Sequence, residues 1–260
     1  MITITTGRIA RLAVRITLLG LAACACLPAN DGGLPSAVHL QDCTELIAFG
    51  PVSQAKVAPL VPHAYTITSF GPGTAGLVVR ASRCQQVTVD DSPSRPIAVA
   101  QIGVAIQSPD GSGNINNYQF LYVTDNVVLA SALNRAGVPA LLDREMAYEF
   151  TVDATGHSGQ LYVAVSPPGF PAWFETGTWS DPPPNSAAPV VANWWFNGPF
   201  GVVKLSTSIG SISYGPAATT VYTSRLSLLG TLFSGNVDNN FAFFNARGVF
   251  GDGELDIILQ

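Results

Sequence analysis

Stretches in which apolar residues alternate with small or polar ones, separated by glycine and proline turns, run through most of this chain. Residues 97–107, for example, place Ile102, Val104 and Ile106 on one side of an extended backbone and small residues on the other. This period of two is typical of β-strands. The chain is therefore predicted to form a single β-rich domain over residues 40–260, a length that all-β folds often reach as one domain.

Two of these stretches, residues 64–70 and 74–81, are joined by Gly71-Pro72-Gly73 and are predicted to form a hairpin. Three short helices are predicted as well, over residues 51–60, 127–135 and 225–233. In the second helix, Thr124 or Asp125 is the expected N-cap and Gly137 the expected end. The other predicted strands cover residues 85–90, 118–123, 146–152, 160–165, 190–196, 202–207, 219–223, 240–249 and 254–259.

The first 23 residues have the pattern of a bacterial lipoprotein signal. Arg8, Arg11 and Arg15 precede a short apolar run that ends in Leu-Ala-Ala before Cys24. This run is too short to span a membrane, which takes roughly 20 apolar residues. Cleavage before Cys24 would leave a diacylated cysteine as the membrane anchor. Ordinary secretion, with cleavage near Ala25 or Ala29, is the alternative.

Residues 24–39 are rich in proline, glycine and polar side chains, and are predicted to be a lipidated tether. The expected location is therefore the bacterial cell envelope, in the periplasm or on the cell surface. The expected partner is the membrane, contacted through the lipid. Cys26 lies within the tether and is assigned no role.

The charge of the chain argues against nucleic acid as a partner. The leader holds three of the 12 basic residues and none of the 17 acidic ones, so the remainder is strongly acidic and has no basic stripe. Cys43 and Cys84 are the two cysteines of the domain. In an oxidising compartment they are the natural disulfide pair. Closing a loop of this length stabilises a fold by roughly 4 kcal/mol on the chain-entropy argument.

Known catalytic and metal-binding patterns are missing from the sequence. His157 lies in a Gly-His-Ser-Gly turn that is not the G-x-S-x-G of a hydrolase elbow. The densest acidic clusters read as turns, and the cysteine spacing does not fit zinc. We therefore expect no metal and no cofactor.

Lysine is rare, and only Lys56 and Lys204 occur. A lysine inside an apolar cavity can act as a Schiff-base nucleophile, which makes Lys204 a weak catalytic candidate. The alternative is a lysine that faces solvent from the strand, opposite Val203 and Leu205.

Aromatic residues gather in two places. The segment 167–189 holds seven prolines and four large aromatics, and is interpreted either as a loop packed over the sheet or as a lid over a pocket. Trp194 and Trp195 are adjacent on a predicted strand, so their side chains face opposite sides of the sheet. Arg80 and Arg83 also face opposite sides, and at most one of them can enter a cavity.

The order of several short motifs resembles the acetoacetate decarboxylase-like fold and uncharacterised exported bacterial proteins with that layout. These motifs are Cys43-x-Glu45, Val61-Pro62-x-x-Tyr65, Asn117-Tyr118 and Trp194-Trp195-x-x-Gly198-x-x-Gly201. The resemblance implies a closed or cone-like antiparallel β-barrel with two or three short helices and an interior cavity. In the decarboxylase, a lysine activated by an adjacent lysine forms the Schiff base. This chain has no such pair, so no catalytic residue is carried over.

Two functional hypotheses follow from these observations. The first is a non-enzymatic envelope lipoprotein that binds a small, mostly apolar ligand or a surface partner. The second is a decarboxylase-like enzyme acting on a small keto acid or a related substrate. A purely structural envelope protein with a packed core is a third reading. The candidate ligand-binding residues are Arg80, Tyr118, Trp173, Trp179, Trp194 and Trp195.

Overall fold

The computed structural model describes residues 38–234, 238–241 and 243–260, which are mostly β-strand. The predicted signal peptide, Cys24, Cys26 and most of the predicted tether lie outside these residues. The last two residues assigned to the tether, Val38 and His39, already belong to the first strand. Within the described residues, no helix has both the length and the hydropathy to cross a membrane.

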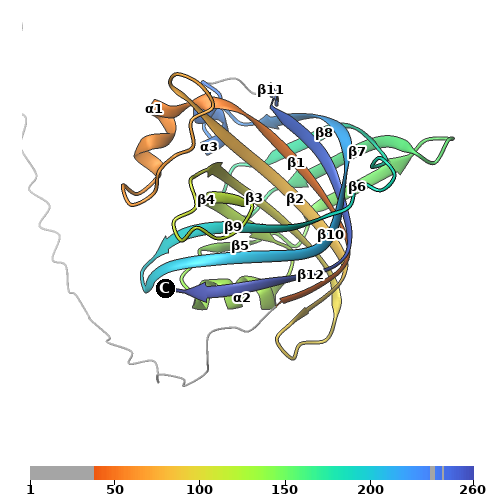
Figure 1. The fold of residues 1–260 in the computed structure, drawn as a ribbon, viewed down its shortest axis with the longest axis horizontal. Coiled ribbons are helices and arrows are strands. Elements are labelled where there is room, and N and C mark those ends of the chain that lie inside the picture. Colours follow the sequence, from red (N-terminus) through yellow and green to blue (C-terminus); the bar gives the residue numbers. More distant parts are fainter. Residues whose placement is uncertain (1–37, 235–237, 242) are drawn as a thin grey trace, which may run out of the picture. The chain divides into compact units, whose positions relative to one another are not determined.

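Seven strands form a ring of hydrogen-bonded neighbours, in the order β12-β1-β2-β3-β4-β9-β10 and back to β12 (Figure 1). Most neighbours are antiparallel, as predicted, but β4 and β9 are parallel, because the chain returns to the ring only after passing through α2 and four strands outside the ring. The ring strands are β1 (Val38–Ser53), β2 (Thr74–Val89), β3 (Arg95–Ala105), β4 (Ile115–Thr124), β9 (Ala188–Gly198), β10 (Gly201–Thr223) and β12 (Phe244–Leu259).

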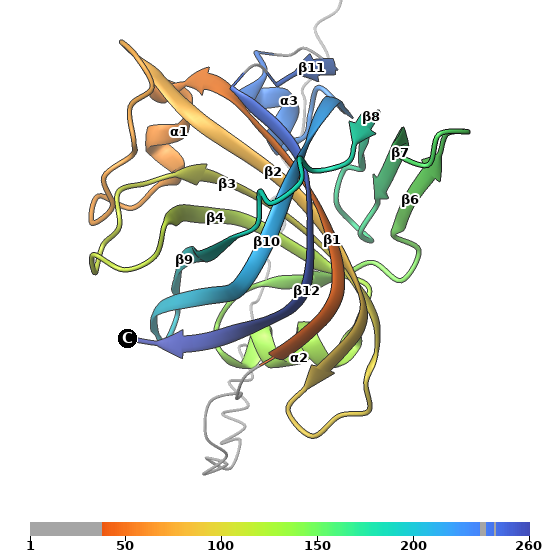
Figure 2. The same cartoon turned by 45° about the vertical axis from the view of Figure 1, so that its right-hand side comes forward.

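A second, outer layer of strands lies beside the ring (Figure 2). β10 belongs to both layers: its first part pairs with β9 and β12, and its last part pairs with β8. Tyr148 ties the layers together, since its hydroxyl donates to the Thr44 carbonyl oxygen at 2.9 Å. The strands outside the ring are β5 (Ala140–Leu142), β6 (Ala147–Val152), β7 (Ser158–Val165), β8 (Trp173–Ser180) and β11 (Asp238–Asn240).

The helices are short, as predicted. They are α1 (Gln54–Val57), extended by a 3₁₀ turn over Ala58–Leu60, α2 (Val127–Arg135) and α3 (Leu228–Leu232). The bounds of α2 agree with the prediction, but its cap does not. The side-chain oxygen of Asn126 accepts from the backbone N–H groups of Val128 and Leu129, so the cap is Asn126 rather than Thr124 or Asp125.

Two further local predictions differ from the structure. The hairpin predicted for residues 64–70 and 74–81 is present only at its turn, where Ser69 forms an antiparallel bridge with Ala75, because β3 occupies this edge of β2 from Leu77 onward. The segment 167–189 is not a continuous loop, since β8 occupies its middle. Its prolines lie on either side of this strand, and Trp173 and Trp179 face the core from it.

Two hydrophobic cores lie on the two faces of the ring. The outer core packs Leu46, Val79 and Ala100, from the outside of the ring, against side chains of β6, β7 and β8. The inner core packs the ring interior against α2, where Leu129 and its neighbours close one end of the ring. Because both faces of the ring strands are covered, the alternation in the sequence sorts side chains between two interiors rather than between core and solvent.

Glu175 of β8 is an anomaly in the outer core. Its side chain is fully buried, and among the described residues neither carboxylate oxygen has a hydrogen-bond partner. The buried indole nitrogen of Trp173 and the hydroxyl of Thr219 lack partners there too. Burial raises the pKa of Glu175 to about 8, partly offset by the nearby Trp173 indole.

This environment predicts a pH-dependent stability that belongs to Glu175. Because its folded-state pKa exceeds its unfolded value, folding favours the protonated acid. The stability is therefore present below about pH 4.5 and is lost as the pH rises toward 8, by roughly 1.4 kcal/mol per pH unit. Urea unfolding at pH 5 and pH 8 should show Glu175→Gln to be less pH-dependent than the parent. Identical pH profiles for the two proteins would contradict the assignment, and Glu149→Gln, an exposed position on β6, is the control.

Candidate functional site

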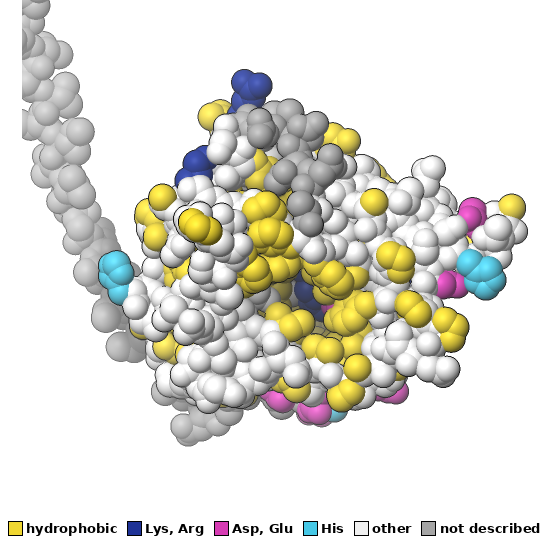
Figure 3. All heavy atoms as spheres, turned by 45° about the horizontal axis from the view of Figure 1, so that its top comes forward, with side chains coloured by type: hydrophobic (Ala, Val, Ile, Leu, Met, Phe, Trp, Pro, Cys, Tyr) yellow, Lys and Arg dark blue, Asp and Glu magenta, His cyan; other side chains and the backbone are white. Residues whose placement is uncertain are grey.

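A cavity of about 400 Å³ occupies the interior of the strand ring. Figure 3 shows its opening as a hollow surrounded by hydrophobic side chains, with basic and acidic side chains visible inside. Apolar side chains from all seven ring strands line its wall. They include Ile47, Phe49, Val78, Val190, Ala192 and Ile209. A concave, mostly apolar site of this size with a few polar groups is the usual form of a small-molecule pocket.

Glu45 and Arg80 are the only charged side chains, among the described residues, that line this cavity. They form an ion pair in which Arg80 Nη2 lies 2.7 Å and Arg80 Nε 2.8 Å from Glu45 Oε2. Arg80 also donates from Nη1 to Gln101 Oε1 at 2.6 Å, and the Tyr214 hydroxyl donates to Glu45 Oε1 at 3.0 Å. Four strands therefore contribute to one hydrogen-bonded group inside the ring.

Strand alternation brings the two charges to the inside. In β1, Leu46 faces the outer core while Glu45 and Ile47 face the cavity, and in β2 Arg80 faces inward between Val79 and Ala81. Ile47 is the cross-strand partner of Arg80, so the ion pair with Glu45 runs diagonally across the two strands.

A glycine on β12 makes room for the acidic side of this group. Gly248 lies opposite both Glu45 and Tyr214 in the β-ladders. A Cβ atom at this position would lie 2.7 Å from Cγ of Glu45 and 2.9 Å from the ring of Tyr214. Any larger residue at position 248 would therefore displace the carboxylate or the phenol.

The surroundings of the ion pair determine the protonation states of Arg80 and Tyr214. Burial by itself lowers the pKa of Arg80, but the adjacent Glu45 carboxylate outweighs burial and raises it above its ordinary value. Burial, and then the same carboxylate, raise the pKa of Tyr214. At neutral pH, Arg80 is thus a cation and Tyr214 a neutral hydrogen-bond donor.

Aromatic rings cluster beside the opening of the cavity. The ring centroid of Phe49 lies 5.0 Å from that of Phe70 and 5.4 Å from that of Phe243, and the latter two lie 5.3 Å apart. Phe70 and Phe243 are both about two-fifths exposed. Gly76 makes the cluster possible, because a Cβ there would lie only 2.4 Å from the Phe49 ring.

A smaller inner cavity of about 30 Å³ lies toward α2. Arg80, Trp194 and Thr207 line both cavities and form the layer between them. Gly103 leaves space for Trp194, since a Cβ at position 103 would lie 2.7 Å from the indole ring. The inner cavity has room for about one or two water molecules, so it is too small to hold an organic ligand.

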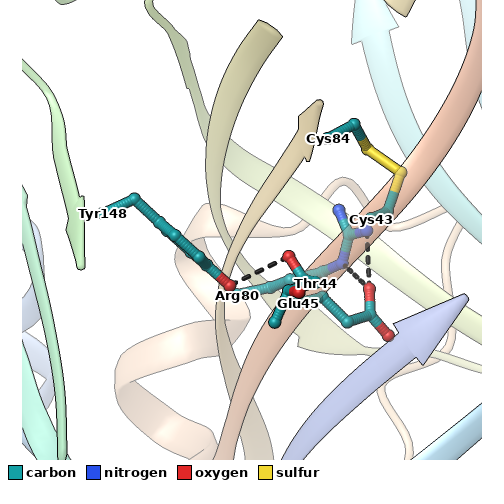
Figure 4. The surroundings of a disulfide bond; sticks show 6 residues. All are labelled: Cys43, Thr44, Glu45, Arg80, Cys84 and Tyr148. Atoms are coloured by element: carbon teal, nitrogen blue, oxygen red, sulfur yellow. Dashed lines mark hydrogen bonds and ion pairs between the residues drawn. A yellow bond between two sulfur atoms is a disulfide. The ribbon is translucent and has the colours of Figure 1, made fainter. Parts of the chain in front are cut away.

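The predicted disulfide is confirmed. Cys43 and Cys84 are bonded across β1 and β2, directly opposite each other in the ladder (Figure 4). Glu45 follows Cys43 by two residues, and Cys84 follows Arg80 by four, so the bond and the ion pair share the inner face of the two strands. The disulfide therefore holds together the two strands that carry the charged pair.

The sequence-predicted ligand residues divide between two places. Arg80 and Trp194 line the cavity. Tyr118, Trp173, Trp179 and Trp195 instead belong to the outer core. Trp194 and Trp195 face opposite sides, as predicted, and of the two arginines it is Arg80 that enters the cavity.

Neither lysine of the chain lines the cavity. Lys204 faces away from it, 2.7 Å from Asp110 Oδ2 and 5.4 Å from the centre of the Trp195 ring. The hydrogen bond from Lys204 lowers the pKa of Asp110. Lys56 donates to the Thr231 carbonyl oxygen at 2.6 Å and to the Ser234 hydroxyl at 3.0 Å.

Sequence reasoning missed Glu45, Gln101 and Tyr214 as cavity residues. The usable signal was Glu45, an acid that directly precedes the apolar run from Leu46 to Phe49 in the same strand pattern. Gln101 likewise interrupts an apolar strand. As for metals, no group of three His, Cys, Asp or Glu side chains that could hold an ion occurs in the part of the chain that the structure describes.

Neither known protein families nor curated proteins match the sequence. Solved structures do match the fold. An acetoacetate decarboxylase-like enzyme from Sphingomonas wittichii superposes with a TM-score of 0.55 at 13% identity, over 86% of this chain and 94% of the other. The acetoacetate decarboxylase from Legionella pneumophila gives 0.55 at 10% identity, over 90% and 93%. The enduracididine biosynthesis enzyme MppR gives 0.51 at 15% identity, over 86% and 88%.

These likenesses define the class of the fold. The chain has an acetoacetate decarboxylase-like fold, mainly β with three short helices, which confirms the predicted fold class. At identities of 10–15%, the comparison speaks for the fold alone.

The buried ion pair predicts a strong and asymmetric response to mutation. Arg80→Met should lower the free energy of unfolding by about 3–5 kcal/mol, because it leaves the Glu45 carboxylate buried without its cation. The double variant Glu45→Leu, Arg80→Met should recover most of that loss. Urea unfolding measures both. Arg135→Met, at an exposed position on α2, is the control and should change stability by no more than about 0.5 kcal/mol. An Arg80→Met cost as small as that of the control would refute the role of the pair.

Proposed function

We propose that residues 38–260 form a binding domain for a small, mostly apolar molecule, held in the cavity of the strand ring. The observation that carries this proposal is the cavity itself, of about 400 Å³, with a wall that is apolar apart from one ion pair and a few amides and hydroxyls. Natural pockets for small molecules have this size and character. The aromatic rings of Phe49 and Phe70 beside the opening add apolar surface where a ligand would enter.

The second candidate is an enzyme acting on a small keto acid or a related substrate. The fold supports it, since the solved structures that share the fold include acetoacetate decarboxylase and a decarboxylase-like enzyme. The cavity favours binding instead, because both lysines of the chain lie elsewhere and cannot form a Schiff base with a molecule inside it.

A neutral fluorescent probe tests the binding proposal. N-phenyl-1-naphthylamine, which brightens in apolar surroundings, should bind the parent protein. It should bind at least tenfold more weakly to Ala192→Phe, because the larger ring fills part of the cavity. Ala154→Phe, at an exposed turn, is the control and should bind like the parent.

Two results would count against binding as the function. One is equal affinity of the probe for Ala192→Phe and the control Ala154→Phe, and the other is no affinity for the parent protein. Borohydride reduction in the presence of acetoacetate or pyruvate addresses the enzyme candidate, since a reduced adduct on Lys204, located by mass spectrometry, would favour catalysis. Absence of the adduct in Lys204→Ala would confirm that Lys204 is the residue that carries it.

We also propose that this domain is exported and held at the bacterial envelope by a lipid on Cys24. The sequence of the leader supports this, and the Cys43–Cys84 disulfide is compatible with an oxidising compartment. A lipidated cysteine with two acyl chains gives stable membrane anchoring where one chain does not.

Labelling with palmitate tests the anchor. The full chain, expressed in a bacterium, should incorporate labelled palmitate, and Cys24→Ser should abolish the incorporation. Cys26→Ser is the matched control, two residues away, and should keep the label. A label retained in Cys24→Ser, or absent from the parent, would rule out lipidation at this cysteine.

A further inference from the structure

We propose that the cavity selects uncharged ligands, with an apolar body and a carbonyl or hydroxyl head, over carboxylates of the same length. This inference rests on the proposed binding function and names its ligand class. It follows from the charge balance and the free hydrogen-bonding groups inside the ring.

The charge of the cavity is already balanced. Glu45 and Arg80 are its only charged groups within the described residues, and Arg80 Nη2 lies 2.7 Å from Glu45 Oε2. Each member of the pair has one further partner: Glu45 accepts from the Tyr214 hydroxyl, and Arg80 donates to Gln101. The positive charge of Arg80 is therefore already neutralised, and it does not need a negatively charged ligand.

A carboxylate ligand would meet an unfavourable field at this place. To contact the Arg80 guanidinium it must come close to the Glu45 carboxylate, which already takes two of its N–H groups. Two like charges at such short range repel, and the low dielectric of a buried site strengthens the repulsion. The ligand would also lose its own hydration on entering a mostly apolar cavity. Glu45 thus has two effects: it stabilises the Arg80 cation, and it repels a negatively charged ligand.

A neutral polar head finds partners without that cost. A guanidinium has five N–H groups, and three of them are used in the bonds to Glu45 and Gln101, which leaves two. Asn117 also lines the cavity, is only 3% exposed, and makes no side-chain hydrogen bond with the described residues. The Thr207 hydroxyl also lines the cavity and makes no side-chain hydrogen bond with the described residues; it lies in the layer between the two cavities. A carbonyl oxygen can accept from the arginine or the amide, and a hydroxyl can both donate and accept.

The size of the cavity sets the length of suitable probes. About 400 Å³ suits a chain of roughly ten carbons better than a two- or three-carbon acid. The test therefore uses 2-decanone, 1-decanol and decanoate, titrated into the full-length protein by isothermal calorimetry at pH 7.5 and below the micellar concentration of decanoate. The parent should bind 2-decanone and 1-decanol at least tenfold more tightly than decanoate.

Glu45→Gln tests the cause of the selectivity. Glutamine keeps the shape and an oxygen acceptor for Arg80 but removes the negative charge, so Arg80 becomes an unbalanced cation. Decanoate should then bind at least tenfold more tightly than to the parent, while 2-decanone should change by less than threefold. Glu149→Gln, exposed on β6, removes the same charge far from the cavity and should leave both affinities unchanged.

Each outcome decides the inference. Decanoate binding to the parent as tightly as 2-decanone would overturn it, and so would a folded Glu45→Gln protein with unchanged affinity for decanoate. If Glu45→Gln does not fold, the comparison of the three probes on the parent still decides. If N-phenyl-1-naphthylamine binds and the probes show no preference, only the selectivity is wrong. If none of the four molecules binds, the proposed function itself fails, and this inference with it.

Discussion

The register between β1 and β2 determines which side chains enter the ring. The two strands pair over most of their lengths, with Cys43 opposite Cys84 and Ile47 opposite Arg80. In a β-ladder, a slip by one residue moves every side chain to the other face. Here a slip of β1 against β2 would carry Glu45 into the outer core and Leu46 into the cavity, while Arg80 stayed inside the ring. The disulfide prevents it, because the two sulfur atoms can bond in only one alignment.

A buried ion pair is unusual in the interior of a ring that is lined mostly by apolar residues. Buried ion pairs seldom add net stability compared with apolar residues of similar volume, because both charges lose their hydration. Stability alone therefore gives little reason for Glu45 and Arg80. Their position on the wall of the cavity, with Gly248 leaving room for the carboxylate, fits a role in recognising what enters. The fold is that of known decarboxylase-like proteins, and a shared fold does not by itself fix what the polar groups inside it do.

Local patterns predicted some elements well and others poorly, and packing explains the difference. α2 was predicted correctly because its ends are coded locally, by a capping segment and by Gly137, which has a φ of 89°. The 64–70 segment was predicted to be a full strand because its residues alternate, but β3 and β1 occupy both edges of β2 from Leu77 onward and leave room for only one bridge, between Ser69 and Ala75. β8 was missed because its flanking prolines dominate the composition of the segment 167–189.

The amino-acid sequence by itself determined the β-rich class, the disulfide pair and the rule that Trp194 and Trp195, like Arg80 and Arg83, face opposite sides. These depend on alternation and on cysteine count, which are local or nearly so. Only the tertiary structure decided which of each pair faces the cavity, since that depends on how the ring closes. It also brought Glu45 to Tyr214, 169 residues away, and to Arg80, 35 residues away. Contacts across such distances arise from strand pairing around the whole ring, and no local pattern in the chain encodes them.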